Sequence, residues 1–213
     1  IGDAELAARL YRNLGGYELA LYGYRGFWKS PGGMDPGTGR AVFPDLNVWG
    51  ASARGTVSKG IGHLEVGYYD SADDRDGDDP FVRNDEFRVL VGYEQELWTD
   101  FTAGVQYYLE WLQDYDDYRD SLEAAAHAAD QCRHVTTLRL TQRLLQQNLT
   151  LSLFAYYSPS DADAYLRPSA NYKISDHWQA EAGGNIFFGR DEWTFFGQFE
   201  RNTNVYAAVR YSF

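Results

Sequence analysis

Apolar and polar residues alternate along most of the chain. In the segment 101–113, apolar side chains occupy every second position, with polar residues or glycine between most of them, and 177–188 repeats this pattern. Successive side chains of a strand point to opposite faces of a sheet, so period two predicts strands with one apolar and one polar face. The pattern predicts about eleven strands. They are 4–13, 17–28, 45–57, 61–70, 84–96, 101–113, 134–144, 149–158, 165–174, 177–188 and 203–213.

The predicted strands are long, and the connections between them differ in length. Strands of soluble proteins usually contain about five or six residues, whereas a tilted strand needs about ten to cross the hydrocarbon of a membrane. Short connections at 14–16, 58–60, 97–100, 145–148 and 175–176 alternate with long ones at 29–44, 71–83, 114–133, 159–164 and 189–202. Tight turns on one side and longer loops on the other are typical of an antiparallel, up-and-down transmembrane β-barrel. We therefore predict this all-β fold, as one domain over 1–213.

The last strand carries a more specific signal. Val205, Ala207, Val209, Tyr211 and Phe213 share one face. An aromatic last residue after alternating apolar positions resembles the closing strand of bacterial, porin-like outer-membrane β-barrels, where the assembly machinery reads it. The resemblance implies a Gram-negative outer-membrane location, with Val209, Tyr211 and Phe213 as the assembly signal. It also implies contact with the lipid bilayer and lipopolysaccharide, and allows a homo-oligomer.

The strand count leads to an expectation about the other end. If Phe213 is periplasmic, the segment 4–13 runs toward the periplasm as well. Bacterial single-chain barrels have an even number of strands and begin on the periplasmic side. We therefore expect a full barrel of about twelve or more strands. Either this chain is the C-terminal part of a longer protein, with at least one strand before Ile1, or the count has missed a strand, most readily at 195–199.

Composition narrows the class further. Hydrophobic residues make up 44% of the chain, but the mean hydropathy is −0.51, and no run of about 18 apolar residues exists that could form a transmembrane helix. Aromatic residues reach 16%, which suits the aromatic girdles of a barrel. The net charge of −12 argues against nucleic acid as a partner. Cys132 is the single cysteine, so no internal disulfide forms.

Charged residues on the polar positions are the candidate lumen lining. The basic candidates lie toward the C-terminus and the acidic ones on the strands before them. They are Arg139, Arg143, Arg167, Lys173 and Arg210, against Glu86, Glu94 and Glu110. Facing walls of opposite charge would create a transverse field that orients polar solutes in a narrow lumen. The alternative is a set of ion pairs that fills and rigidifies a small barrel.

These features predict an outer-membrane channel for passive diffusion of small polar or charged solutes, selected by size and by the lumen field. An export barrel that receives a polymer from an upstream periplasmic domain is a first alternative. A structural barrel that anchors lipopolysaccharide or a partner protein is a second. A barrel hydrolase ranks last, because His63, His127, His134 and His177 are scattered and no catalytic motif is present. We therefore predict that the chain is not an enzyme.

Two loop segments complete the predictions. Asp74, Asp76 and Asp78 in an acidic loop offer the oxygen ligands that Ca²⁺ or Mg²⁺ prefers, although a solvated acidic loop explains the same residues. No other cofactor is predicted. The alanine-rich segment 121–129 predicts a short helix at that position, within the long loop 114–133.

Overall fold

The computed structural model describes residues 4–123 and 127–213, and these are almost entirely β-structure. The strands are β1 (Leu6–Leu14), β2 (Tyr17–Phe27), β3 (Gly33–Asp35), β4 (Arg40–Val42), β5 (Asp45–Val57), β6 (Gly60–Ser71), β7 (Glu86–Trp98), β8 (Phe101–Leu112), β9 (Cys132–Leu144), β10 (Leu149–Ser158), β11 (Asp163–Lys173), β12 (Trp178–Gly189) and β13 (Asn204–Tyr211). Two short helices, α1 (Tyr115–Ser121) and the 3-10 helix η1 (Gly197–Asn202), lie in loops.

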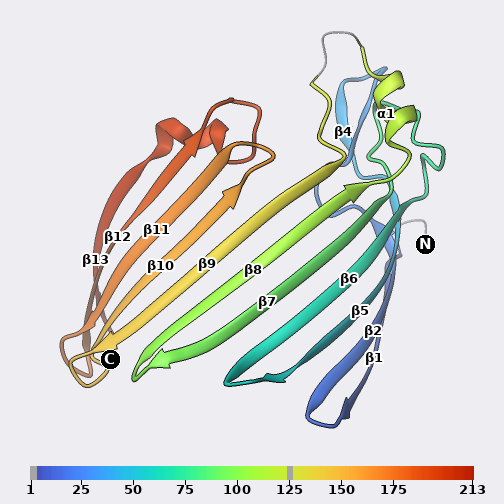
Figure 1. Ribbon diagram of the computed structural model, residues 1–213. Coiled ribbons are helices and arrows are strands. Elements are labelled where there is room, and N and C mark those ends of the chain that lie inside the picture. The colour runs from blue at the N-terminus through green and yellow to red at the C-terminus, as the bar shows by residue number, and fades with distance from the viewer. Residues whose placement is uncertain (1–3, 124–126) are drawn as a thin grey trace. The chain divides into compact units, whose positions relative to one another are not determined.

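Eleven of these strands form one sheet in which neighbours along the chain are neighbours in space (Figure 1). The order is β1-β2-β5-β6-β7-β8-β9-β10-β11-β12-β13, and the register of β9 to β13 is antiparallel throughout. All eleven predicted strands are present, each with boundaries within two residues of the predicted ones. The all-β, antiparallel, up-and-down topology is therefore confirmed.

The connections differ from the predictions in three places. The loop 29–44 contains the β3–β4 hairpin. Its two strands have three residues each, which is too few for an alternating pattern to be recognised in the sequence. The connection between β10 and β11 spans only 159–162, so the predicted strict alternation of short and long connections is wrong at this position. The helix predicted over the alanine-rich segment 121–129 was also misplaced, because α1 lies before that segment and ends at Ser121.

The physical reason for the position of α1 is its charge pattern. Asp116 and Asp117 lie in its first turn and Arg119 in its last, which complements the helix dipole. Of the segment predicted as helix, 127–129 has no helical structure, and 124–126 lies outside the described residues. None of the described helices is long and apolar enough to cross a membrane.

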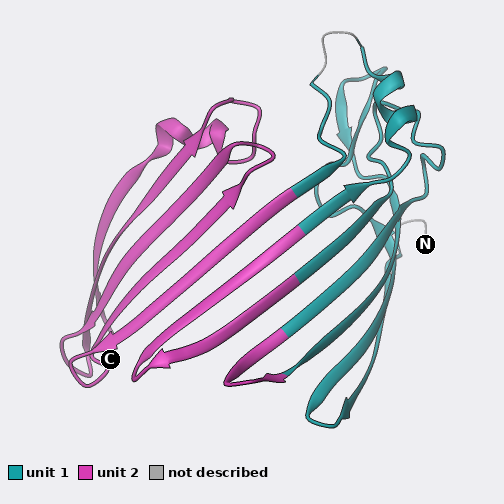
Figure 2. Cartoon of the chain, in the orientation of Figure 1, with its two compact units in different colours: residues 1–55, 63–90, 109–133 teal, residues 56–62, 91–108, 134–213 magenta. Residues whose placement is uncertain are grey.

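The chain divides into two compact units (Figure 2). Unit 1 comprises residues 1–55, 63–90 and 109–133, and unit 2 comprises residues 56–62, 91–108 and 134–213. Each unit therefore holds its own part of the sheet.

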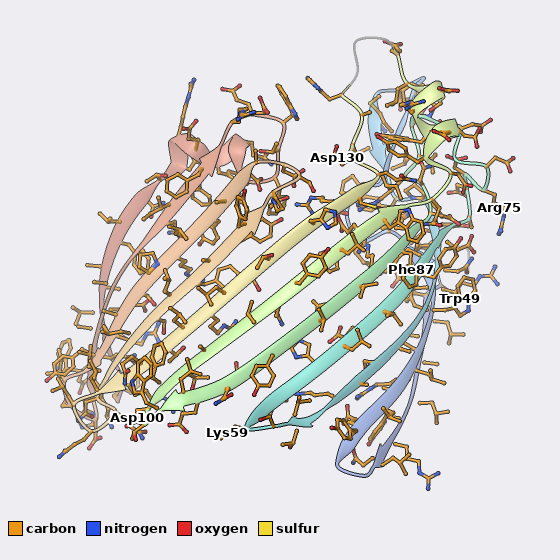
Figure 3. All side chains as sticks on the ribbon, in the orientation of Figure 1. Trp49, Lys59, Arg75, Phe87, Asp100 and Asp130 are labelled. Carbon is orange, nitrogen blue, oxygen red and sulfur yellow. The ribbon has the colours of Figure 1, made fainter. Side chains whose placement is uncertain are left out.

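The side chains show little of the core that a water-soluble protein needs. Within the described ranges, the buried hydrophobic residues are Ala20, Trp28, Leu46 and Val135. Large apolar side chains are instead exposed on the strands, including Leu10, Trp49 (Figure 3) and Val209. This distribution is the reverse of that in soluble domains, which rarely expose contiguous apolar surfaces of this extent.

Candidate functional site

One face of β9 to β13 in unit 2 is polar, and we call it the unit 2 polar face. Cross-strand partners in an antiparallel sheet lie on the same face, so the registers define its members. They are Thr137, Arg139, Thr141, Arg143, Thr150, Ser152, Phe154, Tyr156, Tyr165, Arg167, Ser169, Asn171, Lys173, Gln179, Glu181, Gly183, Asn185, Phe187, Asn204, Tyr206, Ala208 and Arg210.

The opposite face of the same strands is apolar. Leu140 pairs with Leu153 across β9 and β10, and Ala182 pairs with Ala207 across β12 and β13. Many of these side chains are exposed, among them Leu151 at 39% and Val209 at 66%. The two faces of unit 2 therefore present opposite chemistry to their surroundings.

All five predicted basic residues lie on the unit 2 polar face. Arg139 pairs with Phe154, which pairs with Arg167, so the two arginines share a row two strands apart. Lys173 and Arg210 flank Gln179 in a second row. Neighbouring strands are about 4.8 Å apart, which separates the backbones of each pair of cations by about 10 Å.

Among the described residues, the arginines of this face have no acidic partner. Within the part of the chain that the structure describes, Arg139, Arg143, Arg167 and Arg210 form no ion pair, and all four are exposed. Lys173 bonds the turn residue Asp176 at 2.7 Å, and this bond lowers the pKa of the Asp176 carboxyl. The face therefore carries uncompensated positive charge.

Carboxylates on this side of unit 2 are few. Glu181 accepts a hydrogen bond from the Tyr206 hydroxyl at 2.9 Å, and Asp163 lies buried at the start of β11. Glu94, a predicted lumen residue, is exposed on β7, and its carboxylate lies next to Gly104 on β8. The structure thus keeps Glu94 in the same unit as the basic residues.

The other two predicted acidic residues, Glu86 and Glu110, lie in unit 1 and are neutralised there. Glu86 is 1% exposed and forms ion pairs with Arg83 and with Arg88, the latter at 2.6 Å. Glu110 pairs with Arg133 at 3.1 Å and with Arg88 at 3.8 Å. We call these five residues the unit 1 charge cluster.

Aromatic rings complete the environment of the unit 1 charge cluster. The Arg83 guanidinium lies 4.6 Å from the centre of the Trp28 ring, and that of Arg88 lies 4.0 Å from the Tyr69 ring. Trp28 is itself fixed by a hydrogen bond from its indole nitrogen to Ser71 at 3.2 Å. The stacked, paired arginines are held by both charge and ring contacts.

A cavity of about 690 Å³ adjoins the unit 1 charge cluster. Arg83, Glu86, Glu110 and Arg133 contribute to its wall together with loop residues that include Asp130 (Figure 3). Because the lining charges are of both signs and largely paired, the cavity is a recess of mixed polar and apolar character rather than a site for one sign of charge.

The predicted ion-binding aspartates have different surroundings from one another. Asp74 is 5% exposed, and its carboxylate accepts the backbone N–H groups of Gly77, Asp78 and Asp79. Asp76 and Asp78 are exposed. Among residues 4–123 and 127–213, no group of three or more His, Cys, Asp or Glu side chains is placed to hold a metal ion. Ca²⁺ or Mg²⁺ binding in this loop remains a prediction.

At the C-terminal strand, Val209 and Tyr211 lie on the apolar face of unit 2 and Phe213 is exposed. Tyr211 contacts the rings of Trp178 and Phe213. Their role as an assembly signal remains a prediction.

Sequence reasoning missed the basic half of the unit 1 charge cluster. Arg83 lies in a loop, where alternation gives no face, and Arg133 lies at the start of β9, outside the predicted strand. Arg88 was detectable, because it shares the polar face of β7 with Glu86 at a spacing of two.

No protein-family model matches the chain, and no curated protein matches its sequence. Two solved structures are similar to it, "KdgM porin in complex with disordered oligogalacturonate" at a TM-score of 0.41 and "KdgM porin" at 0.40. Each has 12% sequence identity, with 98% of this chain and 91% of the other chain covered.

Proposed function

We propose that this chain forms the wall of an outer-membrane channel that passes small polar solutes and favours anions. The single observation that carries the proposal is the contrast between the faces of unit 2. One face is apolar and exposed, whereas the other holds five cations, four of them without an acidic partner among the described residues.

The apolar face supports a membrane location. Exposed leucine, valine and tryptophan side chains are costly in water but stable against lipid. The strands, mostly ten to thirteen residues long, have the length that crosses hydrocarbon. Contacts with the bilayer, lipopolysaccharide and the assembly machinery belong to this proposal.

The polar face supports conduction with charge selection. Arginines that have no carboxylate partner attract anions, and the attraction is stronger near a low-dielectric wall than in bulk water. Rows of cations about 10 Å apart give a passing anion successive weak contacts, which permit release as well as entry.

Planar-bilayer recording tests the proposal. We expect discrete conductance steps from the purified protein and a reversal potential of the anion-selective sign in a KCl gradient. Arg139→Gln combined with Arg167→Gln removes one row of cations, so the anion-to-cation permeability ratio falls by roughly two- to tenfold.

The matched control is Arg119→Gln. Arg119 lies in α1 of unit 1, is exposed, and contacts Asp116 at 3.8 Å, so its loss leaves the ratio unchanged. Absence of conductance from the wild-type protein, or selectivity for cations, overturns the proposal.

A further inference from the structure

The segment 190–203, between β12 and β13, makes contacts that the proposed function does not use. It contains η1, and Phe196 immediately precedes that helix. The Phe196 ring stacks on Tyr165 with ring centres 5.0 Å apart and meets Tyr156 edge-on at 4.6 Å. It also lies 6.0 Å from the Phe187 ring.

These three partner rings belong to the unit 2 polar face. Tyr156 pairs with Tyr165, and Tyr165 pairs with Phe187, so the rings form one row across β10, β11 and β12. This row is two residues along each strand from the row that contains Arg139 and Arg167. The segment 190–203 therefore folds onto the polar face, directly beside the arginines, and not onto the apolar face.

Polar anchors fix the position of the segment. The Phe196 backbone N–H donates to the buried carboxylate of Asp163 at 2.7 Å. The Thr194 hydroxyl donates to the Asp191 carbonyl at 3.0 Å and accepts the N–H of Gly197 at 3.1 Å. Phe199 adds a ring contact with Phe187 at 5.8 Å.

Two glycines bring the segment and the end of β12 into close contact. A Cβ atom on Gly189 would lie only 2.3 Å from the Cα atom of Gly197, and one on Gly197 would lie 2.1 Å from the Asp191 carbonyl oxygen. Such distances leave no room for side chains at either position. Ring contacts, hydrogen bonds and close backbone packing together hold this loop against the polar face of unit 2.

We propose that the segment 190–203 is a fixed constriction of the channel, and that Phe196 sets the upper size of the solutes that pass. This inference rests on the proposed channel function, in which the unit 2 polar face lines the conduit. A loop that covers part of this face narrows the path beside the arginine row. Because the Phe196 ring holds the loop against three strands, its size and shape determine the remaining width.

Polymer exclusion tests the constriction. Single-channel conductance is measured in the presence of polyethylene glycols of increasing size, for the wild-type protein and for Phe196→Ala. Loss of the ring releases the loop from Tyr156, Tyr165 and Phe187, so we expect a higher conductance and an exclusion limit shifted to larger polymers. Phe196→Leu keeps an apolar side chain without the ring faces and gives an intermediate shift.

Phe43→Ala is the control, because Phe43 is an exposed aromatic residue in a loop of unit 1. It leaves both readouts unchanged, and heat-modifiable gel migration confirms that each variant is folded. The constriction alone is overturned if the wild-type protein conducts and Phe196→Ala has the same exclusion limit. Phe196→Leu takes the place of Phe196→Ala in this comparison if the alanine variant does not fold. A wild-type protein without conductance overturns the channel function from which it follows.

Discussion

Charged residues of this chain have two kinds of surroundings, and Glu86 represents the buried kind. Its carboxylate lies between Arg83 and Arg88, both of which also contact aromatic rings. A buried charge is tolerated when ion pairs and hydrogen bonds replace its water. Removal of one partner then leaves the others uncompensated, which is the costly case.

Glu86→Gln is therefore expected to lower the free energy of unfolding by about 3–5 kcal/mol. The measurement is urea unfolding of the protein in phospholipid vesicles, followed by tryptophan fluorescence. Glu192→Gln serves as the control, because Glu192 and Arg201 are about nine-tenths exposed and exposed pairs contribute about 0–1 kcal/mol. Equal effects of the two substitutions would contradict the assignment of Glu86 as a buried, paired charge.

Asp85, in the loop before β7, predicts a pH dependence of stability. Burial raises its pKa above the ordinary value of 3.8, and repulsion from Asp70 and Asp114 adds to the shift, although hydrogen bonds from Tyr68 and Ser71 oppose it. An acid whose pKa is raised by folding stabilises the folded state in its protonated form. This contribution is complete below pH 3.8 and is lost as the pH rises through the raised pKa.

Asp85→Asn removes this titration while keeping an acceptor for the Ser71 N–H. Between pH 4 and pH 8, we expect the difference in unfolding midpoint between wild type and variant to change with pH, in favour of the wild type at the acidic end. A difference that stays constant over this range would refute the raised pKa.

At the scale of the strand, the decisive property is which face a residue occupies. Ser152 and Leu153 are neighbours near the middle of β10, but Ser152 lies on the unit 2 polar face and Leu153 on the apolar face. A charged side chain at the centre of a lipid-facing surface costs about 2–4 kcal/mol, whereas one on the lumen side is tolerated.

We therefore predict that Leu153→Arg lowers the unfolding free energy in vesicles by about 2–4 kcal/mol. Ser152→Arg, one position away, leaves it within about 0.5 kcal/mol. If Ser152→Arg lowered the unfolding free energy more than Leu153→Arg, the face that carries Ser152 would be the one in contact with lipid. That result would contradict the proposed conduit.

The strands were predictable because their environment imposes period two over ten or more residues. The segment 45–57 and the segment 149–158 coincide with β5 and β10 at both ends. Short or irregular elements lack this signal. The three-residue strands β3 and β4 are stabilised by their mutual pairing, and α1 by the charges of its ends.

The candidate site was predictable to the same extent. Alternation placed Arg139, Arg167 and Arg210 on one face, and they share a face in the registers; that this face lines a lumen stays a prediction. It gave no information on pairing, so the burial of Glu86 between arginines was not foreseen. It also gave no path for the loop that carries Phe196, because a loop is positioned by its contacts and not by its periodicity.

For the whole molecule, the sign of the net charge and the sign of the proposed conduit are opposite. The chain carries a net charge of −12, yet the basic residues of the unit 2 polar face outnumber its carboxylates. The charges close to the conduit, and not the net charge of the chain, therefore select the permeating ion. Salt screens such charges and weakens their effect.

Selectivity is accordingly expected to depend on ionic strength. The Debye length falls from about 10 Å at 0.1 M salt to about 3 Å at 1 M, which is less than the roughly 10 Å between cations in a row. The anion-to-cation permeability ratio, from reversal potentials in KCl gradients, should approach one at the higher concentration. A ratio that does not change with salt would indicate selection by size alone.

The close approach of Gly189 to Gly197 has a consequence for how this sequence can change over time. Neither position has a left-handed backbone that requires glycine, so the constraint comes from the neighbouring atoms. Substitution at either position must be compensated by a new loop path, whereas the exposed loops of unit 1 can vary one residue at a time. Among descendants of this sequence, the two glycines are expected to be retained together or replaced together with the loop between them.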